Sequence, residues 1–267
     1  MTSGVWWFIR RWLPLRKANE RWESYFSRIN DQVGSIFVNM ALEKGLPSAG
    51  RDHLVQLRVT ARALGPNGFP SAGDLDKFAA QMKAIQTEIN RVGGAIYVGH
   101  ITYGGLRESF WYAQKPSSVE DAVRRGMRTF QDYDFMLSSR PEPNWETYRN
   151  VLLPSPHERR LLDNSGVYDA LRKEGDALDE AREVDHWAYF PTADARNEFV
   201  KRLPSGYALR GTTNPNHTPA HTDYGARVFH TSVPGDELDA ATIELFDLAK
   251  ETGGEYDGWE CPIVKTR

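Results

Sequence analysis

Apolar and polar residues alternate along residues 54–61, LVQLRVTA, and a period of two predicts a β-strand with one buried face. The period then lengthens to three and four, because apolar side chains recur at Leu75, Phe78, Met82, Ile85 and Ile89. That spacing predicts a long amphipathic helix. Ser71 with Asp74 reads as a capping box at its start, and the glycine pair 93–94 ends it.

The rest of the first half continues the alternation of strands and a helix. Residues 95–102 (AIYVGHIT) and 107–113 (RESFWYA) are predicted to pair as a hairpin around a glycine-containing turn. A second helix is predicted to be capped by Ser117 with Glu120, and residues 132–137 (DYDFML) form the last strand. The order from Leu54 onward is βαββαβ, with one extra strand in front at residues 35–42 (SIFVNMAL).

The second half repeats this order without repeating the sequence. A short helix at residues 166–176 leads into it. Residues 183–190, 207–212, 226–233 and 255–264 are predicted strands, and residues 192–203 and 236–252 are predicted helices. Asp236 is expected to cap the last helix, and the glycine pair 253–254 to stop it.

Two βαββαβ units predict an α+β protein with two tandem ferredoxin-like domains, each with helices on one face of an antiparallel sheet. Residues 139–160 (SRPEPNWETYRNVLLPSPHERR) are rich in proline and charge, so we interpret them as the connection. The expected organisation is an arm over residues 1–20, a first domain over 21–156 and a second over 157–267.

Composition narrows the functional classes. The net charge of −3 and the isoelectric point near 6.2 give no global basic surface for nucleic acid. A single cysteine excludes an intrachain disulfide and a cysteine-rich zinc site. We expect a cytoplasmic protein without cofactor or metal.

The N-terminal stretch VWWFIRRWLPLRK combines three tryptophans with four cations. Its apolar part is too short to span a bilayer, and it lacks the order of a secretory signal. We interpret it as an arm packed on the protein; contact with a membrane surface and disorder are the alternatives.

The last predicted strand carries the stretch GGEYDGWEC, in which acids and aromatic rings crowd together. In the expected strand order it lies beside residues 185–190, DHWAYF. Alternation places Asp185, Trp187 and Tyr189 on one face of the earlier strand. In the last strand it groups Glu255, Asp257, Trp259 and Cys261 on one face, and Tyr256 and Glu260 on the other.

Such a face is either a recognition platform, because aromatic rings supply rigid contact area, or part of the core beneath the helices. The predicted partner-binding residues are Asp185, Trp187, Tyr189, Tyr256, Asp257, Trp259 and Glu260. The carboxylates among them are candidates for acid–base catalysis in principle. No nucleophile, oxyanion donors or metal partner accompanies them, so we expect no enzyme.

Other motifs are weak. His217, His221 and Asp223 have a metal-like spacing, but Pro215 and Pro219 make a solvated loop the better interpretation. GHITYGG opens a hairpin and lacks the end of a phosphate-binding loop. The acids of the sheet face would repel RNA, and the signature of RNA-binding modules of similar fold is missing.

The stretch VYDALRKEGDALDEAREVDHWAYFP, followed by a helix and GGEYDGWEC, resembles the RraB-type family of regulators of ribonuclease E. The resemblance runs from Val167 to Val264 and is most specific in EYDGW and in GD…R…VDH…F. WESYFSRINDQVGSIFVNMAL, GHITYGGLRESFWYA and NWETYRNVLLPSP resemble the uncharacterised family catalogued as domain of unknown function 695.

The RraB-type resemblance implies a bacterial, non-enzymatic protein that binds the endonuclease of the RNA degradosome and changes which transcripts it cuts. This chain departs from those regulators because it ends in CPIVKTR and begins with a basic arm, where they carry acidic extensions. Two other hypotheses remain open from the sequence: a protein that neutralises a toxin, and an enzyme that uses a cleft between the domains.

Overall fold

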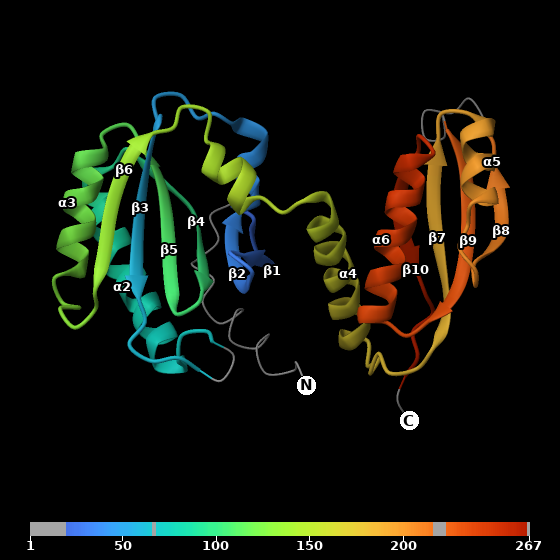
Figure 1. Cartoon of the computed structure of the whole chain (residues 1–267), viewed down its shortest axis with the longest axis horizontal. Helices are drawn as coiled ribbons and strands as arrows, with labels where there is room; N and C mark the ends of the chain where they lie inside the picture. Colours follow the sequence, from blue (N-terminus) through green and yellow to red (C-terminus); the bar gives the residue numbers. More distant parts are fainter. Residues whose placement is uncertain (1–19, 66–67, 216–222, 266–267) are drawn as a thin grey trace. The chain divides into compact units, whose positions relative to one another are not determined.

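The computed structural model describes residues 20–65, 68–215 and 223–265. The predicted N-terminal arm therefore lies outside the described residues, apart from Glu20, and so do His217 and His221 of the predicted loop. The chain divides into two compact units, the first ending at Pro154 and the second beginning at Ser155 (Figure 1).

The first unit is built on a six-stranded antiparallel sheet with the order β1-β2-β4-β5-β3-β6. Its strands are β1 Trp22–Ile29, β2 Gln32–Asn39, β3 His53–Thr60, β4 Ala95–Tyr103, β5 Leu106–Ala113 and β6 Phe135–Pro141. A 3-10 helix, η2 Met40–Gly45, follows β2.

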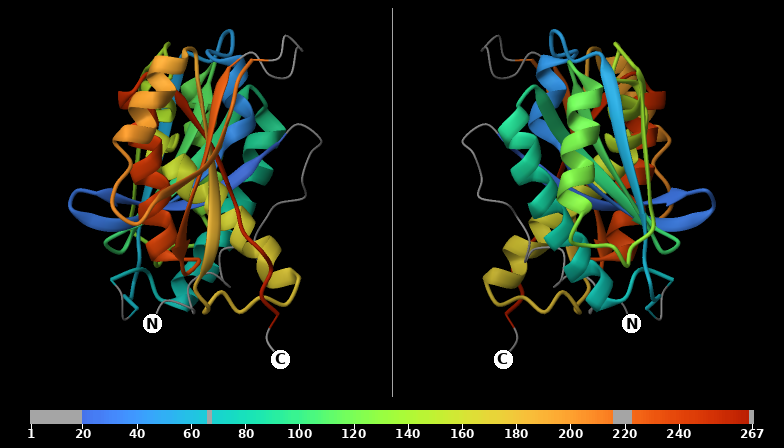
Figure 2. Two further views of the ribbon diagram at one scale, coloured as in Figure 1. Left: turned by 90° about the vertical axis from the view of Figure 1, so that its right-hand side faces the viewer. Right: turned by 90° about the vertical axis from the view of Figure 1, so that its left-hand side faces the viewer.

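Two helices, α2 Ala72–Val92 and α3 Pro116–Met127, lie together on one face of this sheet (Figure 2). Their apolar sides form the core with the alternating residues of β3, as the spacing predicts. The Ser71 side chain accepts a hydrogen bond from the backbone N–H of Asp74, so Ser71 caps α2 as predicted. The reciprocal bond of a capping box is replaced, because the Ser71 N–H donates to the Ala63 carbonyl at 2.8 Å.

The predicted start of α3 is wrong. The helix begins at Pro116, its N-cap is Lys115, and no side chain caps it. Proline suits the first turn because its missing N–H would have no helical partner there. This position makes the Ser117 cap unnecessary.

The sheet is extended by two strands in front of β3 rather than the single one expected. β1 pairs with β2 through a turn at Asn30 and Asp31, whose φ angles are 48° and 62°. Two consecutive positive φ angles are typical of the tight turn that matches the twist of a hairpin, and Asn and Asp adopt them readily.

Most of the proline-rich stretch 139–160 is packed into the first unit, and the division between the units, at Pro154 and Ser155, falls near its end. It forms the end of β6 and a π-helix, η3 Tyr148–Leu152. Trp145 is fully buried, stacks on Tyr112 at 3.9 Å between ring centroids and donates its Nε1–H to the Arg51 carbonyl at 2.7 Å. These buried aromatic contacts hold the stretch in place in spite of its polar composition.

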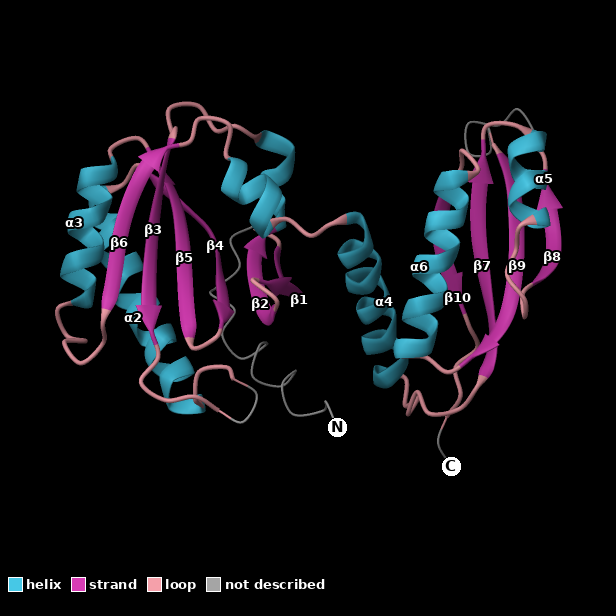
Figure 3. Cartoon of the chain, viewed as in Figure 1, coloured by secondary structure: helices cyan, strands magenta, loops and turns pink. Residues whose placement is uncertain are grey.

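The second unit contains a four-stranded antiparallel sheet with the order β10-β7-β9-β8. Its elements are α4 Pro156–Lys173, β7 Arg182–Phe190, α5 Ala193–Lys201, β8 Ala208–Thr213, β9 Tyr224–Ser232, α6 Asp236–Glu251 and β10 Glu255–Glu260 (Figure 3). α5 and α6 pack on the same face of the sheet, since Phe199 and Leu245 share one core cluster with Ala188 and Val228.

The expected cap of α6 is also wrong, because the N-cap is Gly235 and Asp236 is the first helical residue. Asp236, Glu237 and Asp239 lie in the first turn, where carboxylates stabilise the positive end of the helix dipole.

The chain is thus a mixed α+β protein with two antiparallel sheets, as predicted. Among the described residues, no helix is both long and apolar enough to cross a membrane.

Candidate functional site

Among the described residues of the second unit, the helices pack on one face of the sheet and no helix lies on the other. The buried side chains of β7 alternate along the strand: Val184 packs with α4 and α6, and Ala188 and Phe190 pack with α5 and α6. His186 is fully buried on the same side. Asp185, Trp187 and Tyr189 therefore point to the opposite side, which we call the uncovered face. These three residues share a face, as the sequence predicts.

The last strand is arranged differently from the prediction. β10 has a bulge between Tyr256 and Gly258, so Asp257 has no partner in the ladder. After the bulge, each residue of β10 points to the face opposite to the one that strict alternation predicts. Tyr256 pairs with Ala188 and Trp259 with His186, which places both rings on the helix side, whereas Glu260 pairs with Asp185 on the uncovered face.

Trp259 accordingly lies on the helix side of the sheet, where it is partly buried against the core. Its indole Nε1–H donates to Asn164 Oδ1 of α4 at 2.7 Å, and its ring lies 5.7 Å from that of Tyr168. The Asn164 amide in turn donates to Asp239 and Thr242 of α6. Trp259 thus joins β10 to two helices and does not form a platform with Trp187.

Tyr256 is also internal, with 2% of its surface exposed. Its hydroxyl contacts Nδ1 of the fully buried His186 at 2.8 Å, and Nε2 of His186 contacts Nδ1 of His230 at 3.0 Å. Burial, reinforced by the neighbouring His230, lowers the pKa of His186 to about 3. The ring is therefore neutral at physiological pH and acts as a hydrogen-bonding part of the core.

Asp185 is the centre of the uncovered face. One of its oxygens accepts from Arg227 Nη2 at 2.8 Å, and the other lies 2.7 Å from Arg210 Nε as an ion pair without hydrogen-bond geometry. The Asp185 side chain is 15% exposed, compared with 35% for Arg210 and 41% for Arg227. Arg210 also pairs with Glu183 at 2.7 Å, and Arg227 with Glu260 at 3.7 Å.

Each of these arginines also lies over an aromatic ring. The Arg227 guanidinium carbon is 5.0 Å from the centre of the Trp187 ring, and that of Arg210 is 4.1 Å from the Phe229 ring. Both distances fall within the range of a cation–π interaction. The hydrogen bond to Asp185 raises the pKa of Arg227, so the guanidinium stays charged. On the uncovered face, ion pairs and cation–π contacts therefore hold the aromatic rings, guanidinium groups and carboxylates in fixed positions.

Sequence reasoning missed four members of this face: Glu183, Arg210, Arg227 and Phe229. The signal for two of them was present in the alternation of residues 226–233, because Arg227 and Phe229 pair with Trp187 and Asp185 across the central strands. Arg210 lies at a second bulge, between Leu209 and Gly211, which strict alternation does not anticipate.

Asp176 and Arg182, which belong to the most specific part of the RraB-type pattern, form a buried ion pair with 1% and 4% side-chain exposure. Asp176 also accepts from the backbone N–H groups of Leu178 and Val264 at 2.8 Å each. The guanidinium of Arg182 lowers the pKa of the Asp176 carboxyl to about 2. This pair ties the segment before β7 to the residues after β10.

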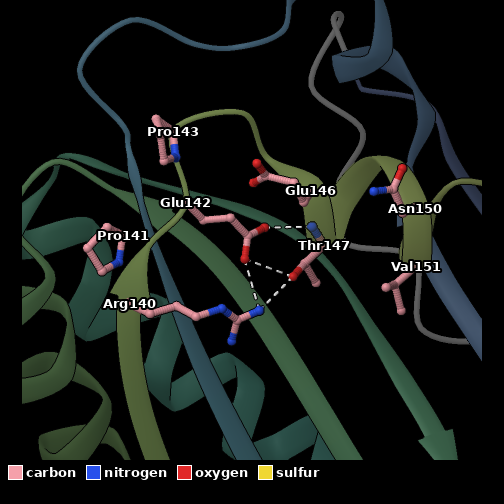
Figure 4. A pocket seen from close by; sticks show the side chains of 8 residues that line it. All are labelled: Arg140, Pro141, Glu142, Pro143, Glu146, Thr147, Asn150 and Val151. Atoms are coloured by element: carbon pink, nitrogen blue, oxygen red, sulfur yellow. Dashed lines mark hydrogen bonds and ion pairs between the residues drawn. The ribbon is translucent and has the colours of Figure 1, made fainter.

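The first unit has an open pocket of about 440 Å³ lined by residues 140–143, 146, 147, 150 and 151 (Figure 4). Its floor is the buried Glu142, which accepts from the Thr147 backbone N–H at 2.6 Å, the Thr147 hydroxyl at 3.0 Å and the Tyr112 hydroxyl, and pairs with Arg140 at 2.9 Å. Since these partners already occupy the carboxylate, the polar floor holds η3 on the sheet.

Over the described ranges, no group of three or more His, Cys, Asp or Glu side chains is placed to hold a metal ion. Cys261 is a free thiol whose pKa is raised by burial, which disfavours the reactive thiolate.

Comparison with known proteins matches each unit to a family. Residues 20–153 match the family of unknown function DUF695, and because this match spans half of the chain, the chain belongs to that family. Residues 162–261 match the family described as regulator of ribonuclease activity B. No curated protein matches the chain.

Among solved structures, the crystal structure of an unknown protein from Galdieria sulphuraria matches with 10% sequence identity. The alignment covers 79% of this chain and 99% of that one, with a TM-score of 0.20. A score this low establishes no common arrangement.

Proposed function

We propose that the protein is a non-enzymatic regulator that binds an RNA-processing endonuclease of the ribonuclease E type through the uncovered face of its second unit. The match of residues 162–261 to the regulators of ribonuclease activity B supports regulation of a nuclease. We further propose that it acts in the bacterial cytoplasm.

The observation that carries the proposal is the constellation around Asp185. Trp187 offers a large aromatic surface held by Arg227, and aromatic and arginine side chains dominate the energetics of protein interfaces. Because β7 and β9 are the central strands of the sheet, these side chains lie in the middle of the face.

The charge of the face favours a cationic protein segment as the partner. Four carboxylates lie on it or at its edge strand, those of Glu183, Asp185, Glu255 and Glu260, against two guanidinium groups. This excess disfavours the phosphates of RNA and attracts lysine and arginine side chains. We therefore propose contact with the nuclease itself and not with its substrate.

We propose that residues 157–267 form a ferredoxin-like domain and that residues 21–156 contain a second one, extended by a hairpin. The βαββαβ order of elements and the strand orders β10-β7-β9-β8 and β4-β5-β3-β6 support this assignment. In such a domain the helices cover one face of the sheet, which leaves the other free for a partner.

The test measures binding of the full chain to purified ribonuclease E and cleavage of a fluorescent RNA by that enzyme. Trp187→Ala is expected to weaken binding about tenfold or more and to relieve the effect on cleavage, as expected for a central interface residue. Leu161→Ala is the matched control, because it truncates an apolar side chain that is 39% exposed on α4, away from the uncovered face.

Circular dichroism and urea unfolding establish that both variants are folded. Equal binding by the two variants, or no effect of the wild-type chain on cleavage, would contradict the proposal.

A further inference from the structure

The first unit contains an arginine that faces the helices and has no carboxylate partner. Arg107 of β5 pairs in the ladder with Val59 and Thr102, and Val59 belongs to the core beneath α2 and α3. Among the described residues, Arg107 donates a hydrogen bond from Nε to the Thr102 hydroxyl at 3.0 Å, and its guanidinium carbon lies 5.0 Å from the centre of the Phe78 ring. Arg58 and Arg140 of the same sheet differ, since each pairs with a glutamate.

Two further hydrogen-bond donors in the same region have no acceptor. Gln81 of α2 is 2% exposed and its Nε2 has no partner, and the same holds for Nε1 of the fully buried Trp111 of β5. Gln81 lies one turn after Phe78, the residue that contacts Arg107. Trp111 belongs to the same core cluster as Phe78. A buried donor without an acceptor is costly, and a protein rarely keeps two together with an unpaired guanidinium.

Aromatic rings continue from these donors across β4 to β1. Tyr97 lies 5.3 Å from Trp111 and 5.5 Å from Trp22, and Trp22 stacks on Phe37 at 4.8 Å. The Tyr97 hydroxyl contacts His100 Nδ1 at 2.6 Å. Burial lowers the pKa of His100 well below its usual value, so this ring adds no second positive charge.

We propose that these residues form a binding site for a small organic anion with a flat apolar body. Its carboxylate or phosphate oxygens pair with Arg107 and accept from Gln81 and Trp111, and the rings of Tyr97 and Trp22 contact the body. An oxyanion supplies the acceptors that all three donors lack, and guanidinium groups bind such oxygens strongly. Burial lowers the pKa of Arg107 to about 10, which still leaves it charged at neutral pH.

Calorimetric titration of the full chain with benzoate tests the site, with benzamide as a neutral ligand of the same shape. We expect benzoate to bind in the millimolar range or tighter and to raise the melting temperature, and benzamide to do neither. Arg107→Met is expected to weaken benzoate binding at least tenfold, and Gln81→Met severalfold. Arg124→Met removes the same charge from an exposed position on α3 and should bind as the wild type does.

Failure of benzoate to bind the wild-type chain overturns the proposal, and the donors are then satisfied by internal water. Equal binding of benzoate and benzamide, or equal binding by Arg107→Met and Arg124→Met, overturns it as well. If Arg107→Met does not fold, Gln81→Met and the two ligands decide the matter, and unchanged benzoate binding by Gln81→Met contradicts the site.

Discussion

Trp259 holds β10 against α4 through its hydrogen bond to Asn164 and its contact with Tyr168. Trp259→Ala removes both and leaves a cavity, so we expect the free energy of unfolding to fall by about 3 kcal/mol. Trp259→Phe keeps most of the packing and loses the hydrogen bond, at a cost of about 1 kcal/mol. Urea unfolding followed by circular dichroism measures both values.

If Trp259→Ala left the stability unchanged and abolished binding to the nuclease, the ring would belong to the interface and the assignment of faces would be wrong.

His186 makes the stability of the second unit depend on pH. The folded state keeps the ring neutral down to about pH 3, whereas the usual pKa is 6.5. Unfolding therefore takes up a proton between these values, and the free energy of unfolding falls as the pH is lowered through 6.5. Between pH 7 and pH 5 the expected loss is about 2 kcal/mol.

Urea unfolding at several pH values checks this. His186→Phe should flatten the dependence. If the free energy of unfolding of His186→Phe depends on pH as strongly as that of the wild type, another group takes up the proton.

Strict alternation along the strand correctly predicts which side chains of β7 share a face of the sheet. It does not do so for β10. Asp185, Trp187 and Tyr189 lie together because β7 is paired without interruption along its length. A single unpaired residue at Asp257 exchanges the faces of β10, and no pattern of apolar residues marks that position. The RraB-type pattern contains the buried groups Asp176, Arg182 and His186 and the partly buried Trp259, which have structural contacts. The pattern therefore identifies the fold more securely than the contact surface.

At the scale of elements, the approach of α2 and α3 depends on one glycine. A Cβ atom at Gly126 would lie 2.6 Å from Cα and 2.8 Å from the backbone nitrogen of Ile85. Gly126→Ala should therefore destabilise the first unit by about 1–2 kcal/mol, because the overlap outweighs the better helix propensity of alanine.

Gly166 of α4 is the matched control, since nothing lies within 4 Å of a Cβ atom placed there. Gly166→Ala should stabilise the second unit by about 1 kcal/mol. Thermal unfolding of both variants checks the pair, and stabilisation by Gly126→Ala would show that the helices separate without cost.

Periodicity predicted the long elements well, and local chemistry decided the rest. The helix α2 and the strand β3 follow from spacing alone. The hairpin of β1 and β2 depends on a two-residue turn, and the stretch after β6 depends on Trp145 and Tyr148, whose burial its prolines and charges conceal. The division between the units lies within the stretch that composition indicated, but most of that stretch belongs to the first unit.

At the scale of the whole molecule, each unit has its own sheet and its own core. We expect the fragments 20–154 and 155–267 to fold independently, with circular dichroism spectra that add up to that of the intact chain. An unfolded fragment, or spectra that do not add, would show that one unit requires the other.

The ion pairs around Asp185 determine how much electrostatic free energy a partner gains when it binds to the uncovered face. A cationic group from a partner must displace Arg210 or Arg227 from that carboxylate, so docking is an exchange of counter-ions in which most of the electrostatic gain cancels. The released guanidinium groups are then free to take acidic groups of the same partner. Such an exchange selects partners that present both signs of charge, and it favours their fast release.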